Sequence, residues 1–211
     1  MCIRDRYSST PSELHLPWQN VLIGSPAGPC PAWLFPGESS TWVVQVHGRG
    51  VTRAECLRAV PVLHAAGFPN LVVSYRNDGE APRSRSGSYA LGAAEWRDVD
   101  AAVSYALRHG AERVILMGWS MGGAVALQTA LNSGNRDRIA GLILESPVID
   151  WRSVLRFQAR AAGMRAPLPD LAMSALSVPL TARLSGAENA ISFDSLDIVA
   201  RADELKVPIL I

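Results

Sequence analysis

The sequence predicts an α/β fold: a mostly parallel sheet with helices on both faces. Short apolar runs rich in β-branched residues alternate with longer segments of helical periodicity along most of the chain. The apolar runs are continuous rather than alternating, which is typical of strands buried on both faces. The 211 residues fit a single domain, and a hydrophobic content of 48% supplies enough side chains for its core.

The first half of the chain predicts a hairpin, two buried strands and two helices. Thr52 is placed to cap the first helix, and Pro61 is expected to end or kink it. Gly110 is placed to end the second helix. The expected elements are a hairpin of 21–23 and 32–35, a strand at 41–48, a helix at 52–68, a strand at 70–75, a polar loop at 76–88 and a helix at 91–110.

The second half continues the alternation of strands and helices. Residues 148–186 interrupt it, because they are apolar and arginine-containing but show no strand pattern, and they are too long for a plain connection. The expected elements are a strand at 113–119, a helix at 121–134, a strand at 138–147, a short helix at 192–205 and a strand at 207–211.

Composition argues against several classes of function. A net charge of +1 with interspersed acidic and basic residues gives no electrostatic case for nucleic acid or an anionic membrane. We expect no membrane span, because no run of 18 apolar residues occurs, and a cytoplasmic location, because the start lacks a signal-peptide pattern. The three cysteines (Cys2, Cys30 and Cys56) have neither CxxC spacing nor a histidine cluster, so we expect no disulfide framework, metal or cofactor.

The segment GWSMGG at 118–123 joins an expected strand to an expected helix. A serine at so sharp a junction is forced toward strained backbone angles, and small residues two before and two after it, Gly118 and Gly122, relieve the crowding. The Ser120 hydroxyl would then stand at the rim of the sheet beside a helix N-terminus, where developing negative charge is favoured. The pattern therefore predicts that Ser120 is a nucleophile.

A second loop, HGRG at 47–50, follows the strand at 41–48. In a parallel sheet this loop emerges at the same edge as Ser120, and its glycines, Gly48 and Gly50, let backbone N–H groups approach a substrate oxygen. We expect the amides of Arg49 and Met121 to form an oxyanion hole. His47 is expected to hold the loop by hydrogen bonding rather than to act as a base.

These residues resemble the α/β-hydrolase superfamily, in particular its serine aminopeptidase-like and esterase-like hydrolases. The matching motifs are HGRG, YRNDG at 75–79, GWSMGG, ESPVIDW at 145–151 and ADELKVPILI at 202–211. The resemblance runs from about Glu13 to the last residue and is specific for the fold, not for a substrate. It implies a serine hydrolase that cleaves an ester, thioester or small amide of a small-molecule acyl substrate, without a metal or cofactor.

The resemblance also implies a domain plan. Residues 1–12 form a disordered or artefactual leader, 13–147 the first part of the hydrolase core, 148–190 a short helical cap, and 191–211 the start of the second part of the core. Apolar residues of the cap either line an acyl pocket or pack the cap onto the sheet. Arg152, Arg156 and Arg160 share one helix face, which is interpreted as a solvated face rather than an anion site.

The catalytic partners of Ser120 are missing from the expected positions. The family order is serine, then an acid, then histidine, but all four histidines precede Ser120. Asp150 is an alternative acid, although we favour it as a helix cap; Glu145 is a weaker candidate, and Asp78 is expected to order its loop.

The final residues, VPILI, have the pattern of a buried strand. We therefore expect a fragment whose last strands are missing, with roughly 50–80 further residues carrying the acid and the histidine. Such a fragment would be nearly inactive. Two alternatives remain open, a non-catalytic protein that binds a ligand or partner and a serine peptidase on the same fold, and the oligomeric state is also open.

Overall fold

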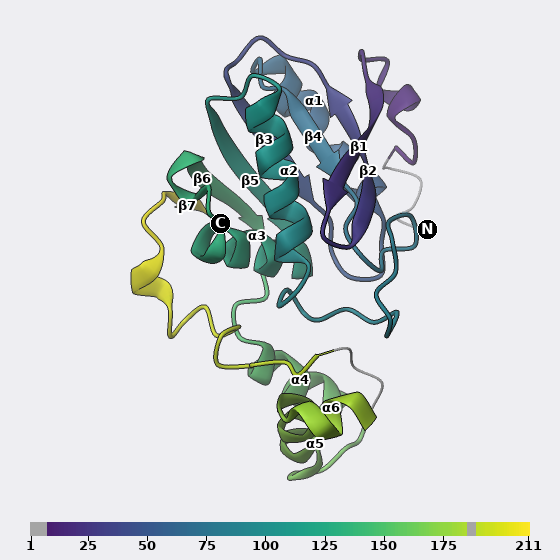
Figure 1. Cartoon of the computed structure of the whole chain (residues 1–211), viewed down its shortest axis with the longest axis vertical. Helices are drawn as coiled ribbons and strands as arrows, with labels where there is room; N and C mark the ends of the chain where they lie inside the picture. Colours follow the sequence, from purple (N-terminus) through teal and green to yellow (C-terminus); the bar gives the residue numbers. More distant parts are fainter. Residues whose placement is uncertain (1–7, 185–188) are drawn as a thin grey trace.

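The computed structural model describes residues 8–184 and 189–211. Within them, seven strands form one sheet in the order β1-β2-β4-β3-β5-β6-β7 (Figure 1). The pairs β1–β2 and β2–β4 are antiparallel, and all the others are parallel. The expected mostly parallel α/β sheet is confirmed. The strands are β1 (Gln19–Ser25), β2 (Gly28–Phe35), β3 (Thr41–Val46), β4 (Asn70–Val73), β5 (Arg113–Trp119), β6 (Ile139–Glu145) and β7 (Ile209–Leu210).

Helices cover both faces of the sheet, as expected. On one face, α2 (Trp96–Arg108) and α3 (Met121–Asn132) bury their apolar stripes against β1, β3, β5 and β6. On the other face, the 3₁₀ helix η3 (Arg53–Arg58) and α1 (Val60–Ala65) cover a smaller cluster that includes Phe35, Leu57 and Trp119. Burial of strands on both sides explains why their sequences read as continuous apolar runs.

The predicted hairpin forms, but β2 extends through residues that looked like part of the turn. Pro29 and Pro31 pair with Gly24 and Leu22 of β1. The carbonyl of Pro31 accepts from the amide of Ser74, so the edge that lacks their N–H groups faces β4. Because β4 pairs only with residues 32–35 of β2, no ladder donor is required from either proline.

The helix expected at 52–68 is two helices. Thr52 caps η3 as expected, its side chain accepting from the amide of Ala54. Pro61 does not end a helix; it lies in the first turn of α1, where a missing N–H costs no hydrogen bond.

The helix expected to begin at residue 91 begins at Trp96. Leu91 and Gly92 have φ values of 59° and 102°, which are incompatible with a helix. Their turn is stabilised by the buried carboxylate of Glu95, which accepts from the amides of Ala90 and Gly92. Gly110, with φ 104°, follows the end of α2 as expected.

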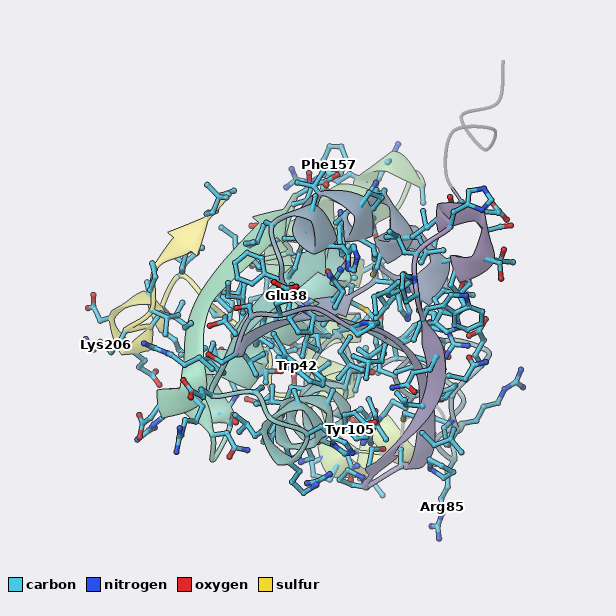
Figure 2. The ribbon with its side chains drawn as sticks, turned by 90° about the horizontal axis from the view of Figure 1, so that it is seen from above. Glu38, Trp42, Arg85, Tyr105, Phe157 and Lys206 are labelled. Atoms are coloured by element: carbon cyan, nitrogen blue, oxygen red, sulfur yellow. The ribbon has the colours of Figure 1, made fainter. Side chains whose placement is uncertain are left out.

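Three helices follow the carboxyl end of β6 and form a small lobe to one side of the sheet (Figure 1). They are α4 (Trp151–Ala161), α5 (Leu168–Ser177) and α6 (Pro179–Leu184). The lobe exposes large apolar side chains; Phe157, for example, is 73% exposed and lies at the outer margin of the molecule seen from above, as do Arg85 and Lys206 (Figure 2). Residues 185–188 of the expected cap lie outside the described residues.

The short helix expected at 192–205 is wrong. Only η5 (Ala202–Glu204) is helical there, and the preceding residues form turns. Ser195 Oγ donates to the carbonyl of Ser192, and Asp197 accepts from the amide of Ala200, so side chains compete with the helical pattern for the backbone groups. The strand expected at 207–211 forms as β7, which pairs in parallel with β6.

At the amino-terminal side, residues 1–7 of the expected leader lie outside the described residues. Residues 11 and 12 are not disordered, because they begin the 3₁₀ helix η2 (Pro11–Leu14), where Pro11 is buried. Over the described chain, no helix is both long and apolar enough to cross a membrane.

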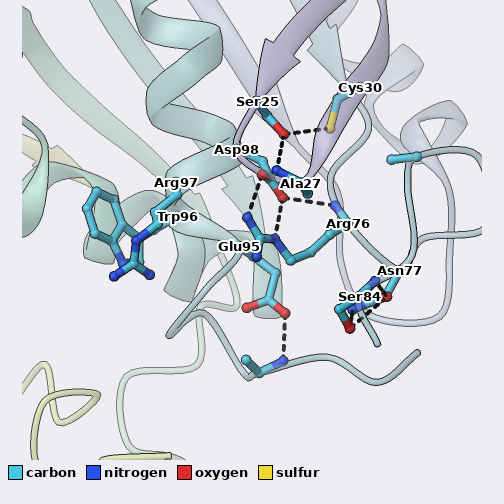
Figure 3. A network of polar contacts seen from close by, with 12 residues as sticks. Ser25, Ala27, Cys30, Arg76, Asn77, Ser84, Glu95, Trp96, Arg97 and Asp98 are labelled. Atoms are coloured by element: carbon cyan, nitrogen blue, oxygen red, sulfur yellow. Dashed lines mark hydrogen bonds and ion pairs between the residues drawn. The ribbon is translucent and has the colours of Figure 1, made fainter. Parts of the chain in front are cut away.

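A buried ion pair ties the end of β4 to α2 (Figure 3). The Nε and Nη2 atoms of Arg76 lie 2.7 and 2.8 Å from the two carboxylate oxygens of Asp98, and the Arg76 amide also donates to this carboxylate. The Asp98 side chain has no exposed surface. This pair orders the start of the loop at 76–88 against the helix.

We expect Asp98→Ala to lower the free energy of unfolding by about 3–5 kcal/mol, because it leaves a partly buried guanidinium without its partner. Urea denaturation measures the change. Glu204→Ala, which breaks an ion pair whose carboxylate side chain is 54% exposed, is the control and should cost less than about 1 kcal/mol. Equal losses in the two variants would contradict this role of Asp98.

Candidate active site

Ser120 is the single residue between β5 and α3. Its φ of 52° and ψ of −115° lie outside the regions that L-residues favour, so the turn stores strain. The Ser120 amide donates to the carbonyl of Glu145 at 2.9 Å, and its carbonyl accepts from the amides of Gly123 and Val148. These bonds to the end of β6 and the segment after it hold the strained turn, and they leave Ser120 exposed at the carboxyl edge of the sheet.

The two glycines flanking Ser120 occupy positions where a side chain has no space. A Cβ at Gly122 would lie 2.2 Å from the carbonyl oxygen of Val46 and 2.4 Å from that of His47. A Cβ at Gly118 would lie 2.5 Å from the carbonyl oxygen of Gly122. The first turn of α3 therefore packs directly on the backbone at the ends of β3 and β5.

The loop at 47–50 lies beside Ser120, because β3 and β5 are parallel neighbours with Val46 opposite Gly118. A Cβ on Gly48 would lie 3.5 Å from the Cβ of Ser120. Arg49 and Gly50 are exposed, and Gly50 has a φ of 76°. The structure thus brings the two predicted motifs together at one edge of the sheet.

His47 is buried beneath this loop, with both ring nitrogens in hydrogen bonds. Its Nδ1 lies 2.8 Å from the carbonyl oxygen of Gly48, and its Nε2 lies 3.1 Å from a carboxylate oxygen of Asp78. The ring also stacks on that of Tyr75 at a centroid distance of 4.3 Å. Since a carbonyl can only accept, Nδ1 donates to it, and both ring nitrogens are engaged within the protein.

The carbonyl of Gly48 receives a second donor, the hydroxyl of Tyr75, at 3.2 Å; the same hydroxyl donates to the carbonyl of His47 at 2.9 Å. In a trans peptide the N–H points away from the carbonyl. Fixing the Gly48 carbonyl toward His47 and Tyr75 therefore aims the Arg49 N–H in the opposite direction.

Asp78 holds the ring of His47 in place through their hydrogen bond. Its second carboxylate oxygen accepts from the amides of Glu80 and Ala81, each at 2.8 Å. Burial acts to raise the pKa of Asp78, but the hydrogen bonds from His47 and these amides outweigh it, so the pKa lies below its ordinary value. The loop at 76–88 is thereby linked to the loop at 47–50.

Asp150, the alternative acid, caps α4. Its carboxylate accepts from the Ser153 amide at 3.1 Å and from the Ser153 hydroxyl, and these bonds lower its pKa. Glu145 lies closer to Ser120 along β6, and its carboxylate accepts from the Trp119 indole at 2.8 Å. We assign Asp150 to capping, the interpretation favoured by its place in the sequence.

The other histidines have different surroundings. His109 follows the end of α2, where its Nδ1 lies 2.8 Å from the carbonyl oxygen of Tyr105 and its ring stacks on the tyrosine ring. His64 lies in α1, which precedes the amino end of β4, and His15 ends η2. Among the described residues, no group of three or more His, Cys, Asp or Glu side chains could hold a metal ion.

Sequence reasoning assigned no role to three residues that contact the loop at 47–50 or its neighbours: Glu55, Arg58 and Tyr75, although Tyr75 begins the YRNDG motif. Tyr75 is buried at the end of an expected strand, which gave no sign of a polar role. Glu55 and Arg58 have the i, i+3 spacing of a surface ion pair, and only their position in space relates them to Gly48 and Glu145.

The chain belongs to the alpha/beta hydrolase family, whose model matches residues 43–205. Among solved structures, an esterase from Pyrococcus furiosus superposes with a TM-score of 0.68 at 20% identity, covering 95% of this chain and 71% of that one. A monoacylglycerol lipase from Paleococcus ferrophilus gives 0.54 at 20% identity, covering 85% and 75%. At these identities the likeness shows the fold alone. No curated protein matches the chain.

We expect Gly122→Ala to lower the free energy of unfolding by about 3 kcal/mol, the upper end of the usual cost of overpacking, because the added methyl group would overlap backbone carbonyls that cannot move independently. Denaturant titration measures this. The control is Gly134→Ala, where no atom lies within 4 Å of the added carbon, with an expected change below about 1 kcal/mol. A Gly122→Ala protein as stable as the control would show that α3 does not approach β3 this closely.

Asp78 should make stability depend on acid pH. Because its pKa is lowered in the folded chain, its contribution is present above its ordinary value of 3.8 and is lost as the pH falls through the lower folded value. We expect the free energy of unfolding of Asp78→Asn to fall less steeply than that of the unsubstituted chain below about pH 4. Parallel slopes for the two proteins would contradict the shift.

Proposed function

We propose that the chain is a serine hydrolase that cleaves an ester, thioester or small amide through an acyl-serine intermediate. The observation that carries the proposal is the exposed Ser120 on a strained turn, next to the loop at 47–50. Strain of this kind persists only where the surrounding structure imposes it, and it places the hydroxyl where a substrate can approach. The names of two structural neighbours, an esterase and a lipase, agree with an ester substrate.

In the proposed reaction, Ser120 Oγ attacks the carbonyl carbon of the substrate. The π electrons of the C=O bond move onto the carbonyl oxygen. The N–H groups of Met121 and Arg49 bind the resulting oxyanion. Met121 is the first residue of α3, so its N–H has no acceptor within the helix. Collapse of the oxyanion expels the alcohol, thiol or amine, and water then cleaves the acyl-serine.

We assign the role of base to none of the four histidines, so the Ser120 proton passes to solvent water, and solvent water protonates the leaving group. No histidine follows Ser120 in the 211 residues. His47 uses both ring nitrogens to hold the loop, and its contacts support the positioning role expected for it. We therefore expect slow turnover by this chain, because Ser120 attacks without a general base to activate it.

The helical lobe is proposed to cap the site. The lobe begins at Trp151, shortly after Glu145 and Val148, which hydrogen-bond to Ser120. Its exposed apolar side chains suit an acyl group. Arg152 and Arg156 pair with Asp194 and Asp170, which supports the interpretation of this face as a solvated, ion-paired one rather than an anion site.

We expect slow hydrolysis of p-nitrophenyl acetate by the purified chain, and Ser120→Ala should reduce it to the background rate. Because nitrophenolate is a good leaving group, a serine hydroxyl without a general base can still attack this ester, at a rate far below that of a complete triad. Absorbance of released nitrophenolate measures the rate. The matched control, Ser12→Ala, removes an exposed hydroxyl in η2 and should leave the rate unchanged.

Labelling with a fluorophosphonate gives an independent test. Covalent modification of Ser120, located by mass spectrometry of the digested protein, would support the enzyme. Hydrolysis that persists in Ser120→Ala would contradict the assigned nucleophile. A folded chain showing neither hydrolysis nor labelling would favour the non-catalytic, ligand-binding alternative.

A further inference from the structure

A charged pair lies behind the loop at 47–50, on the 3₁₀ helix that follows it. Glu55 and Arg58 are three residues apart on η3, and each side chain is about one quarter exposed. A carboxylate oxygen of Glu55 accepts from the amide of Gly48 at 2.7 Å. This short bond to an ionised acceptor belongs to the stronger class of protein hydrogen bonds.

Arg58 extends the contact to the Ser120 turn. Its Nη2 lies 3.9 Å from Glu55 and 3.4 Å from Glu145, and its guanidinium lies 5.0 Å from the centre of the Trp119 ring. The second carboxylate oxygen of Glu145 accepts from the Trp119 indole, and the Glu145 carbonyl accepts from the Ser120 amide. A continuous set of contacts thus connects the Gly48 amide to Trp119 and to the Ser120 amide.

We propose that Glu55 and Arg58 are positioning residues that keep the loop at 47–50 in register with the Ser120 turn. Their role in catalysis rests on the proposed function, in which the loop provides the N–H donor of Arg49 and the turn provides that of Met121. Two donors on separate segments serve one oxyanion only if their spacing is held, and a displacement of about 1 Å can cost about 100-fold in rate.

The loop needs this support because, apart from a hydrogen bond between the Gly50 backbone and Tyr89, little else restrains its outer side. A Cβ at Gly50 would meet no atom within 4 Å, and Arg49 is exposed. His47 and Tyr75 hold carbonyls of the loop, whereas Glu55 holds the amide of Gly48. Together they constrain both ends of the peptide unit between His47 and Gly48.

Arg58 has a second consequence. Glu55 and Glu145 place two carboxylates near a site where negative charge develops, and their field would oppose an oxyanion. A guanidinium between them offsets this repulsion as well as fixing their positions. We therefore expect loss of Arg58 to affect the rate although it touches no substrate.

The test uses the slow Ser120-dependent hydrolysis of p-nitrophenyl acetate, which in the absence of a base reports on the oxyanion donors. Glu55→Ala should lower kcat about 10- to 100-fold with KM changed less than about twofold, and Glu55→Gln, which keeps an acceptor for Gly48, should restore part of the rate. Arg58→Met should lower kcat more than Arg58→Lys, which keeps the charge.

Arg201→Met is the matched control. Arg201 and Glu204 form another i, i+3 pair around a 3₁₀ helix, but η5 lies before the amino end of β7, at the edge of the sheet opposite Ser120. Its rate should equal that of the unsubstituted chain. A loss of rate as large as that of Arg58→Met would show a general effect of removing surface charge and would overturn the proposal.

Amide resonances in ¹⁵N-edited NMR spectra test the connection without relying on activity. Glu55→Gln should shift the Gly48 amide, and Arg58→Met should shift both the Gly48 and the Ser120 amides, whereas Arg201→Met should shift neither. Unchanged Gly48 and Ser120 resonances together with unchanged hydrolysis would overturn the inference while the Ser120 assignment stands. Absence of any Ser120-dependent hydrolysis would instead refute the proposed function, and the amide shifts would still decide whether the side chains couple the two segments.

Discussion

The approach of α3 to the backbone at the ends of β3 and β5 is the constraint on which the candidate site depends. A methyl group at Gly122 of α3 would overlap the carbonyls at the end of β3. A methyl group at Gly118 of β5 would overlap the backbone of the first turn of α3. This contact places the helix N-terminus against the loop that follows β3 and forces the residue between β5 and α3 into a strained conformation. The same backbone approach thus brings together exposed Ser120, the first N–H of α3 and the neighbouring loop.

Polar side chains, not apolar packing, complete the site. The loop at 47–50 lies at the rim, where a core cannot extend, so its peptide groups are held individually. His47 and Tyr75 fix carbonyls from the buried side, Asp78 holds the His47 ring, and Glu55 fixes an amide from the side of η3. Backbone donors aimed in this way need no reorganisation when charge develops, which is the physical advantage of a rigid frame around flexible glycines.

The failures of sequence-based prediction have local physical causes. Periodicity placed one helix at 52–68, but Pro61 permits a helix to begin as readily as it ends one, and the structure uses the former. Pro29 and Pro31 of β2 look like turn residues in the sequence. A strand tolerates proline only where the missing N–H faces an unpaired edge, and the sequence does not show which edge that is. The segment at 192–205 has helical spacing, yet its serines and aspartates bond the nearby backbone and keep it in turns.

The sequence by itself determined the mostly parallel sheet, the order of its main elements, and the meeting of GWSMGG with HGRG, because hydrophobic periodicity and glycine spacing are local properties and parallel strands end at one edge. It also supported the capping role of Asp150 and the loop-holding role of His47. Only the tertiary structure decided which side chains hold the loop. Tyr75 and Arg58 contact residues distant in the chain, and Glu55 reaches back to Gly48 through a turn; no pattern within their own segments indicates those partners.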